Sequence, residues 1–268
     1  MTANACVYDD TSTGVWSYLN GTMTWSETDS NADGVPESFT MTMGTGGTPF
    51  TSRENRISDN RLLSESVFNL TFSGNFGTSI AACGGGYEPD SMTITMDGSG
   101  SSKEDVNADG TLDENVSFTY TQLTLISTIN TFDINCEPDT GTLTMSGGFS
   151  GTDNIESNNS MSMSISSSNP LSITWEAVTG GENVTINGTF TVDTACFGSS
   201  LTISTLTPIF TPDGSDCPTS GVIKVTGNVT VTITYTATAG AGVQIDEGSN
   251  GSVDQTLPTC EDAEACIE

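Results

Sequence analysis

Apolar and polar residues alternate with a period of two along several stretches of the chain. In the stretches 39–43, 92–96, 161–165 and 229–235, Met, Ile, Val, Phe or Tyr alternates with Thr or Ser. Successive side chains of a strand point to opposite faces of a sheet, so this alternation predicts half-buried antiparallel strands with Thr and Ser facing water. No stretch shows the 3.6-residue period of an amphipathic helix. The pattern therefore predicts an all-β fold.

An internal repeat underlies these expected strands. The segment 69–76 aligns without gaps to the segment 183–190. In each copy a cysteine follows, then a strand pattern, then a second cysteine just before a further strand pattern. Elements that recur in the same order over this length indicate a duplication.

Two loops share the pattern D-x-N-x-D-G-x-x-D/E, and each runs into a strand pattern S-F-T-x-T. Oxygen side chains at loop positions one, three and five can converge on a hard cation, and the glycine at position six permits a sharp turn. A main-chain carbonyl at position seven and a carboxylate at position nine complete the shell. The expected calcium ligands are Asp29, Asn31, Asp33, Val35 and Glu37 in the first loop and Asp105, Asn107, Asp109, Thr111 and Asp113 in the second.

An EF-hand would need a Glu at position twelve, where these loops have Thr40 and Val116, and it would need helical flanks. The two loops instead resemble the calcium loops of FG-GAP (integrin-type propeller) and thrombospondin type 3 repeats. The resemblance covers the loops alone, identifies no parent family for the whole chain, and implies two calcium sites. The alternative is a pair of acidic Asn/Asp/Gly hairpin turns that need no metal.

The cysteines indicate disulfide bonds. The chain has seven, with no C-x-x-C pair and no histidine, which disfavours a zinc site and is typical of an oxidising compartment. The repeat predicts the pairs Cys83–Cys136 and Cys196–Cys217, and the chain ends predict Cys6 with Cys260 or Cys266. The odd count leaves one thiol free, lipidated or bonded to another chain, and acylated Cys6 is the lipid alternative.

These features predict antiparallel sandwich- or barrel-like units related by internal duplication and stapled by disulfides and calcium loops. The expected divisions are an N-terminal partial repeat with the first calcium loop (1–60), a first β repeat with the second loop (61–165), a second β repeat (166–250) and an acidic Cys-containing tail (251–268). The alternative is that these ranges form one continuous β domain.

The charge of the chain excludes several partners. Five basic residues stand against 34 acidic ones, for a net charge of −29. Such a surface repels nucleic acid and anionic membranes and attracts divalent cations. The sequence has no apolar run long enough for a membrane helix and no signal peptide, so we expect a secreted or cell-surface protein whose signal peptide is absent from this chain.

The absence of histidine rules out Ser/His/Asp and Cys/His catalytic sites, and we expect a protein that is not an enzyme. The favoured function is an extracellular or cell-surface structural protein, stabilised by calcium, that self-associates into a homopolymer such as a fibre, surface layer or adhesin. The alternative is a secreted or lipid-anchored β-sandwich module that binds surface glycan. A third class is a carboxylate-dependent glycoside hydrolase.

Overall fold

The computed structural model describes residues 2–10, 14–30, 36–44, 48–77, 89–105, 107, 109–132, 138–153, 155, 160–194, 198–238 and 242–258. Over these residues the chain forms strands and turns and no helix. The strands are β1 (Thr2–Asp10), β2 (Val15–Thr28), β3 (Ser38–Met43), β4 (Phe50–Arg56), β5 (Leu62–Phe76), β6 (Ser91–Glu104), β7 (Glu114–Phe132), β8 (Pro138–Asp153), β9 (Ser160–Ile165), β10 (Leu171–Val178), β11 (Gly181–Thr194), β12 (Gly198–Pro212), β13 (Ser220–Thr226), β14 (Thr230–Thr236), β15 (Val243–Glu247) and β16 (Gln255–Leu257).

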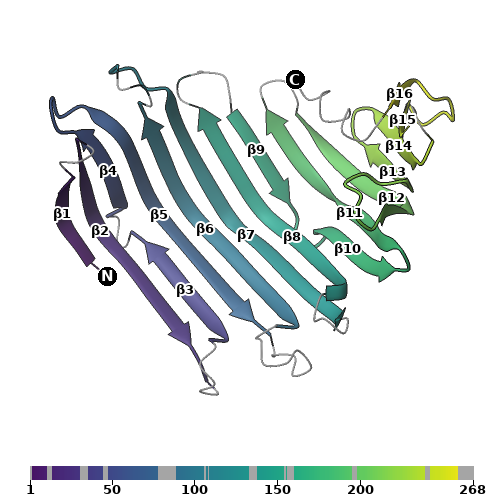
Figure 1. The fold of residues 1–268 in the computed structure, drawn as a ribbon, viewed down its shortest axis with the longest axis horizontal. Coiled ribbons are helices and arrows are strands. Elements are labelled where there is room, and N and C mark those ends of the chain that lie inside the picture. The colour runs from purple at the N-terminus through teal and green to yellow at the C-terminus, as the bar shows by residue number, and fades with distance from the viewer. Residues whose placement is uncertain are drawn as a thin grey trace.

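All of these strands belong to one antiparallel sheet, which Figure 1 shows as a broad layer that curls at its C-terminal end. The strand order is β1-β2-β3-β5-β6-β7-β8-β10-β11-β12-β13-β14-β15-β16, and β4 and β9 pair beside this path. Most neighbours in the sheet are also neighbours in the chain, which is the order that successive hairpins produce. The predicted all-β antiparallel class is therefore confirmed. The sandwich- or barrel-like grouping and the division at residues 60, 165 and 250 stay predictions.

Two pairs of short strands share a position in the sheet end to end. Strands β3 and β4 both lie between β2 and β5, and strands β9 and β10 both lie between β8 and β11. In both cases the earlier short strand pairs with the later half of the following long strand. The repeated pairing does not follow the gapless alignment of the sequence segments 69–76 and 183–190. The second short strand begins its pairing at Phe68 of β5 in the first case, where that strand is β4, and at Asn187 of β11 in the second, where it is β10.

The register separates the two faces of the sheet by chemistry. Residues directly opposite each other on paired strands share a face, as in the row Trp25, Met41 and Phe72. Across β2 to β8 these rows give one apolar face. We define this apolar face as Met23, Trp25, Phe39, Met41, Met43, Phe50, Phe68, Leu70, Phe72, Phe76, Met92, Ile94, Met96, Phe118, Tyr120, Leu123, Leu125, Leu143, Met145 and Phe149.

The opposite side carries hydroxyl side chains. We call it the threonine face and define it as Thr24, Thr40, Thr42, Thr71, Thr93, Thr95, Thr124, Thr142 and Thr144. Hydroxyls on neighbouring strands bond to each other, for example Thr95 with Thr124 at 3.3 Å. The alternation of apolar and hydroxyl residues therefore sorts them to two sides of one sheet, as the sequence predicted.

The buried apolar side chains gather toward the C-terminal strands. Ile209, Ile223, Val243 and Leu257, from β12, β13, β15 and β16, are each less than a tenth exposed. These strands form the part of the sheet that curls in Figure 1. No large side chain among the described residues is completely buried. The core of the described residues is therefore small, and most of it lies where the sheet curls; Leu123 of β7 and Ile165 of β9 are buried elsewhere.

Candidate functional site

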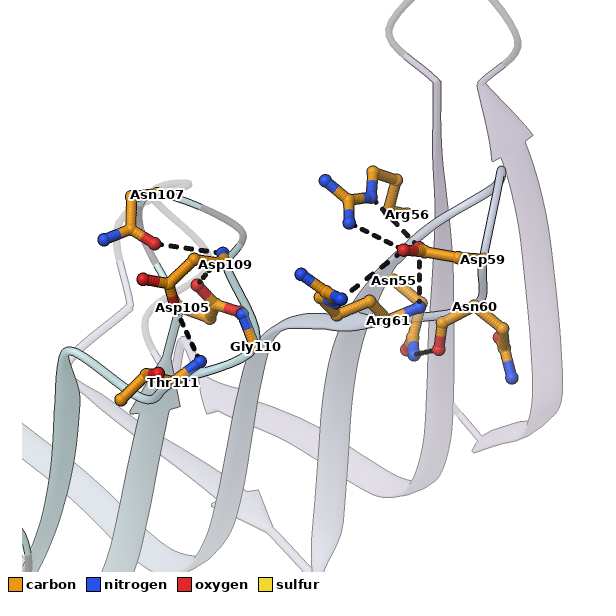
Figure 2. A network of polar contacts seen from close by, with 10 residues as sticks. All are labelled: Asn55, Arg56, Asp59, Asn60, Arg61, Asp105, Asn107, Asp109, Gly110 and Thr111. Carbon is orange, nitrogen blue, oxygen red and sulfur yellow. Dashed lines mark hydrogen bonds and ion pairs between the residues drawn. The ribbon is translucent and has the colours of Figure 1, made fainter.

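The second predicted calcium loop connects β6 to β7 and is organised by Asp105. This residue is 3% exposed, and its carboxylate oxygens accept the backbone N–H groups of Asp109 at 3.0 Å and Gly110 at 2.8 Å. An aspartate that receives backbone amides further along the chain folds the loop around itself (Figure 2). Asp105 also donates its own N–H to the Leu63 carbonyl at 2.8 Å, which ties the loop to β5.

The remaining polar residues of this loop are drawn together by local bonds. Asn107 Oδ1 accepts the Asp109 N–H at 3.0 Å, and Asp109 Oδ1 accepts the Thr111 N–H at 2.7 Å. The carboxylate of Asp113 lies 3.4 Å from the N–H of Asn107 and 3.5 Å from its Nδ2. The structure therefore brings together positions one, three, five and nine of the predicted ligand set.

The carboxylate oxygens of this loop point to backbone amides rather than to one another. Among the described residues, no group of three or more His, Cys, Asp or Glu side chains is arranged to hold a metal ion. The predicted ligand set, however, mixes carboxylates with an Asn oxygen and a main-chain carbonyl, which are common calcium donors. The donor types therefore fit calcium, and calcium stays a prediction.

The first predicted loop is described only at its two ends. Asn31, Asp33 and Val35 lie outside the described residues. At the end of the loop, the Glu37 carboxylate accepts the N–H of Ser30 at 2.8 Å and its hydroxyl at 3.0 Å, and the Glu37 N–H donates to the Thr28 carbonyl at 2.8 Å. The second loop closes the same way, because Asp113 donates its N–H to the Glu104 carbonyl at 2.8 Å.

A third loop of this kind connects β15 to β16, and the sequence analysis missed it. Asp246 accepts the N–H of Asn250 at 3.0 Å and of Gly251 at 2.7 Å, and Asp254 accepts the N–H of Glu247 at 2.7 Å. Its pattern, D-x-G-x-N-G-x-x-D, has glycine at position three, where the two predicted loops have asparagine. A search for Asp at one, Gly at six and Asp or Glu at nine finds all three loops.

An ion-pair network lies beside the second loop, in the turn between β4 and β5. Arg56 bonds to Asp59 through Nη2 at 2.6 Å and Nε at 3.0 Å, and Arg61 Nε lies 3.7 Å from the same carboxylate. Figure 2 shows Arg61 on the side of this turn that faces the loop, where a Cβ on Gly110 would lie 3.3 Å from its Cζ. Two guanidinium groups therefore stand close to the predicted calcium ligands.

The charges of this corner of the sheet shift several pKa values. The hydrogen bond from Arg56 lowers the pKa of Asp59 to about 2. The bond to Asp59, and more weakly the charge of Asp105, raises the pKa of Arg56. Burial opposes ionisation of Glu65, but Arg53 and Lys103 outweigh it and lower the pKa of Glu65. Four of the five basic residues of the chain lie here, and each has an acidic partner within 4 Å.

Of the cysteines in the predicted disulfides, the structure describes Cys217 and the backbone of Cys6. Cys217 is disulfide-bonded. Cys83, Cys136, Cys196, Cys260 and Cys266 lie outside the described residues, and Cys6 is placed in β1 by its backbone pairing with Leu19. The pairs Cys83–Cys136, Cys196–Cys217 and Cys6 with Cys260 or Cys266 therefore stay predictions.

Comparison with known proteins assigns no family: no family model, curated protein or solved structure matches this chain. In the part of the chain that the structure describes, no helix is long and apolar enough to cross a bilayer. The argument for function therefore rests on the loops, the charge and the two faces of the sheet.

Proposed function

We propose that this chain is an extracellular or cell-surface structural protein whose loops bind calcium and whose copies associate in its presence. The observation that carries the proposal is the second loop, in which Asp105, Asn107, Asp109 and Asp113 are linked by hydrogen bonds within one turn. Carboxylate and amide oxygens are the donors that calcium takes in proteins.

Charge supports a role for calcium in association. Copies that carry a net charge of −29 repel each other, and divalent cations screen that repulsion and neutralise acidic loops. The disulfide at Cys217 favours an oxidising compartment outside the cytosol. The chain has no histidine, and the described acidic groups lie mainly in turns and at strand ends, so we propose a structural rather than a catalytic role.

Light scattering in millimolar calcium, followed by an excess of EGTA, tests this function. Loops of this type in extracellular modules bind calcium with Kd values of about 0.1–1 mM, so the chelator should remove the ion. We expect large particles in calcium that shrink in EGTA, and smaller ones in magnesium at equal ionic strength. Particles of one size in all three solutions would overturn the calcium dependence.

A second candidate function is glycan binding. A hollow of about 360 Å³ on the apolar face is lined by Phe118, Tyr120 and Phe149, and the Tyr120 and Phe149 ring centroids are 5.3 Å apart. Aromatic rings of this kind also stack on sugars. Oligosaccharide titration monitored by intrinsic fluorescence separates the two functions, because sugar binding lost in Tyr120→Ala without any calcium-dependent change in particle size would favour the glycan module.

A further inference from the structure

Apolar side chains are buried in the C-terminal strands, whereas the apolar face of β2 to β8 is largely open. In the curled C-terminal strands, residues such as Ile223 and Val243 are less than a tenth exposed. Of the residues that define the apolar face on β2 to β8, all of which are described, Leu123 is the only buried one, and Trp25 is 56% exposed. The chain therefore buries four apolar side chains in the C-terminal strands, where Leu206 stays 59% exposed, and leaves most of those that define the apolar face of β2 to β8 in partial contact with water.

The total surface is too large for a compact monomer. Monomeric proteins of 27.8 kDa expose about 11,000 Å² by the size scaling of folded chains, whereas this chain exposes 15027 Å². The excess is about 4,000 Å² for one chain, whereas obligate homodimers bury about 2,000–5,000 Å² or more over both partners together, or about 1,000–2,500 Å² per chain. One chain therefore exposes more extra surface than its half of a stable dimer interface needs.

The flat shape of the apolar face is suited to packing against a second sheet. Phe39 lies across Gly74 of the neighbouring strand, and a Cβ there would approach its ring to 2.3 Å; Phe118 lies in the same way across Gly100, at 2.5 Å. Trp25 stacks on Phe39 with ring centroids 5.1 Å apart. Rings laid over glycine keep the face low and even, and apolar faces of this kind pack about 10 Å apart in sandwiches.

The charges of the chain favour a copy of itself over a lipid as the occupant. The acidic residues that share this face lie near the ends of their strands, so the middle of the face carries no charge and is complementary to itself; they are Glu27, Glu54, Glu104, Glu114 and Asp153. A net charge of −29 repels anionic lipid surfaces, and single acyl chains cover far less area than this face exposes. Opposed acidic ends require screening, which calcium provides.

We propose that two copies of this chain pack apolar face to apolar face over β2 to β8, forming a two-layered dimer. This inference rests on the proposed function in one respect, because the dimer is the unit from which the calcium-dependent assembly is built. It names the surface through which two copies associate, which the proposed function leaves open.

Sedimentation velocity of the full chain tests the dimer, in millimolar calcium and in EGTA, both with 0.15 M salt. Met41→Glu places a charge on the apolar face between Trp25 and Phe72, and its matched control, Thr40→Glu, places the same charge on the neighbouring residue of the same strand, on the threonine face. We expect Met41→Glu to weaken dimerisation about a hundredfold or more, because each interface would bury two unpaired charges. Thr40→Glu should sediment as the wild type does.

A second variant, Trp25→Ala, guards against a folding defect in Met41→Glu, because it removes a ring that is more than half exposed. Far-ultraviolet circular dichroism establishes that each variant retains the sheet. We expect Trp25→Ala to shift the dimer toward monomer, by about tenfold or more in Kd, in line with the loss of a large aromatic contact from the interface.

The outcomes separate the dimer from the proposed function. A dimer of the same size in EGTA and in calcium, with no larger particles in calcium and dissociated by Met41→Glu, would support the face and overturn the calcium dependence. Calcium-dependent particles that survive both Met41→Glu and Trp25→Ala would overturn the face and leave the proposed function standing. A wild-type monomer at 100 µM protein, or a monomer that takes up detergent or neutral lipid vesicles instead of dimerising, would overturn the dimer.

Discussion

The loops 105–113 and 246–254 fold in the same way although their sequences differ at the positions that matter most for calcium. In each, the Asp at position one accepts the N–H groups of positions five and six, and position nine donates its N–H to the carbonyl that precedes the loop. The glycine at position six has a positive φ in both, 97° at Gly110 and 88° at Gly251. The shared backbone therefore depends on positions one, six and nine.

The two loops differ in the oxygen atoms available to a cation. Position three is Asn107 in one and Gly248 in the other, and position five is Asp109 in one and Asn250 in the other. The turn can therefore form without a complete set of cation ligands, because the third loop forms the same turn with a glycine at position three. The motif thus predicts a shape at positions one, six and nine, and predicts calcium only with oxygen side chains at three and five.

The largest expected effect comes from removing the organising aspartate of each loop. The bonds that Asp105 accepts are partly buried, whereas those that Asp246 accepts are exposed to water. A buried donor left without a partner costs about 1–3 kcal/mol, and water replaces the lost partner at an exposed site. We expect Asp105→Ala to lower the free energy of unfolding by about 3 kcal/mol and Asp246→Ala by about 1 kcal/mol, measured by urea denaturation.

The isosteric variants Asp105→Asn and Asp246→Asn serve as controls, since each keeps one acceptor oxygen and should recover part of the loss. All four measurements belong in EGTA, so that calcium does not contribute. Equal losses for the two alanine variants would contradict the claim that burial distinguishes the two loops.

The next largest effect is expected from exchanging the residues at position three between the second and third loops. Asn107→Gly should weaken calcium binding at the second loop about tenfold, because losing one contact to a charged group costs on the order of 1.5 kcal/mol. Gly248→Asn should add a weak site to the third loop, and asparagine tolerates the φ of 85° at this position. Isothermal titration with calcium measures both, and unchanged heats in both variants would show that position three is not a ligand.

Local features of this fold follow from the sequence, and its long-range pairing does not. The alternation at 39–43 predicts a strand with Met41 and Thr40 on opposite faces, and β3 has that arrangement. The pattern of the second loop predicts a sharp turn, and Asp105 forms one by accepting the N–H groups of Asp109 and Gly110; the convergence of Asp105, Asn107 and Asp113 on a cation stays a prediction. The strand and the turn are predicted correctly because strand periodicity and turn chemistry depend on residues close together in the chain.

The pairing register required information that the sequence alone lacks. The sequence repeat aligns Asn69 with Asn183, but the pairing of β4 with β5 and of β10 with β11 does not match at these two positions. Register depends on hairpin geometry and on contacts between distant strands, which the alignment does not contain. The sequence analysis also missed the network of Arg56, Asp59 and Arg61 beside the second loop. These residues come near the loop only because the sheet places β4, β5 and β6 next to one another, and this strand order is not evident in the sequence. The third loop was missed because the search required an oxygen at position three.

The smallest expected effect is the difference in stability loss between alanine substitutions at the position-six glycines of the two loops. Alanine at a positive φ costs about 1–2 kcal/mol wherever it is placed, so Gly110→Ala and Gly251→Ala should both lower stability by that amount. A Cβ on Gly110 would also lie 3.3 Å from Arg61 Cζ, whereas a Cβ on Gly251 meets nothing within 4 Å. Gly110→Ala should therefore cost a few tenths of a kcal/mol more, because the guanidinium has to move away from the loop. Thermal unfolding in EGTA measures the difference, and the double variant Gly110→Ala/Arg61→Gln should reduce it; a larger loss at Gly251 would mean that the Arg61 contact does not distinguish the two turns.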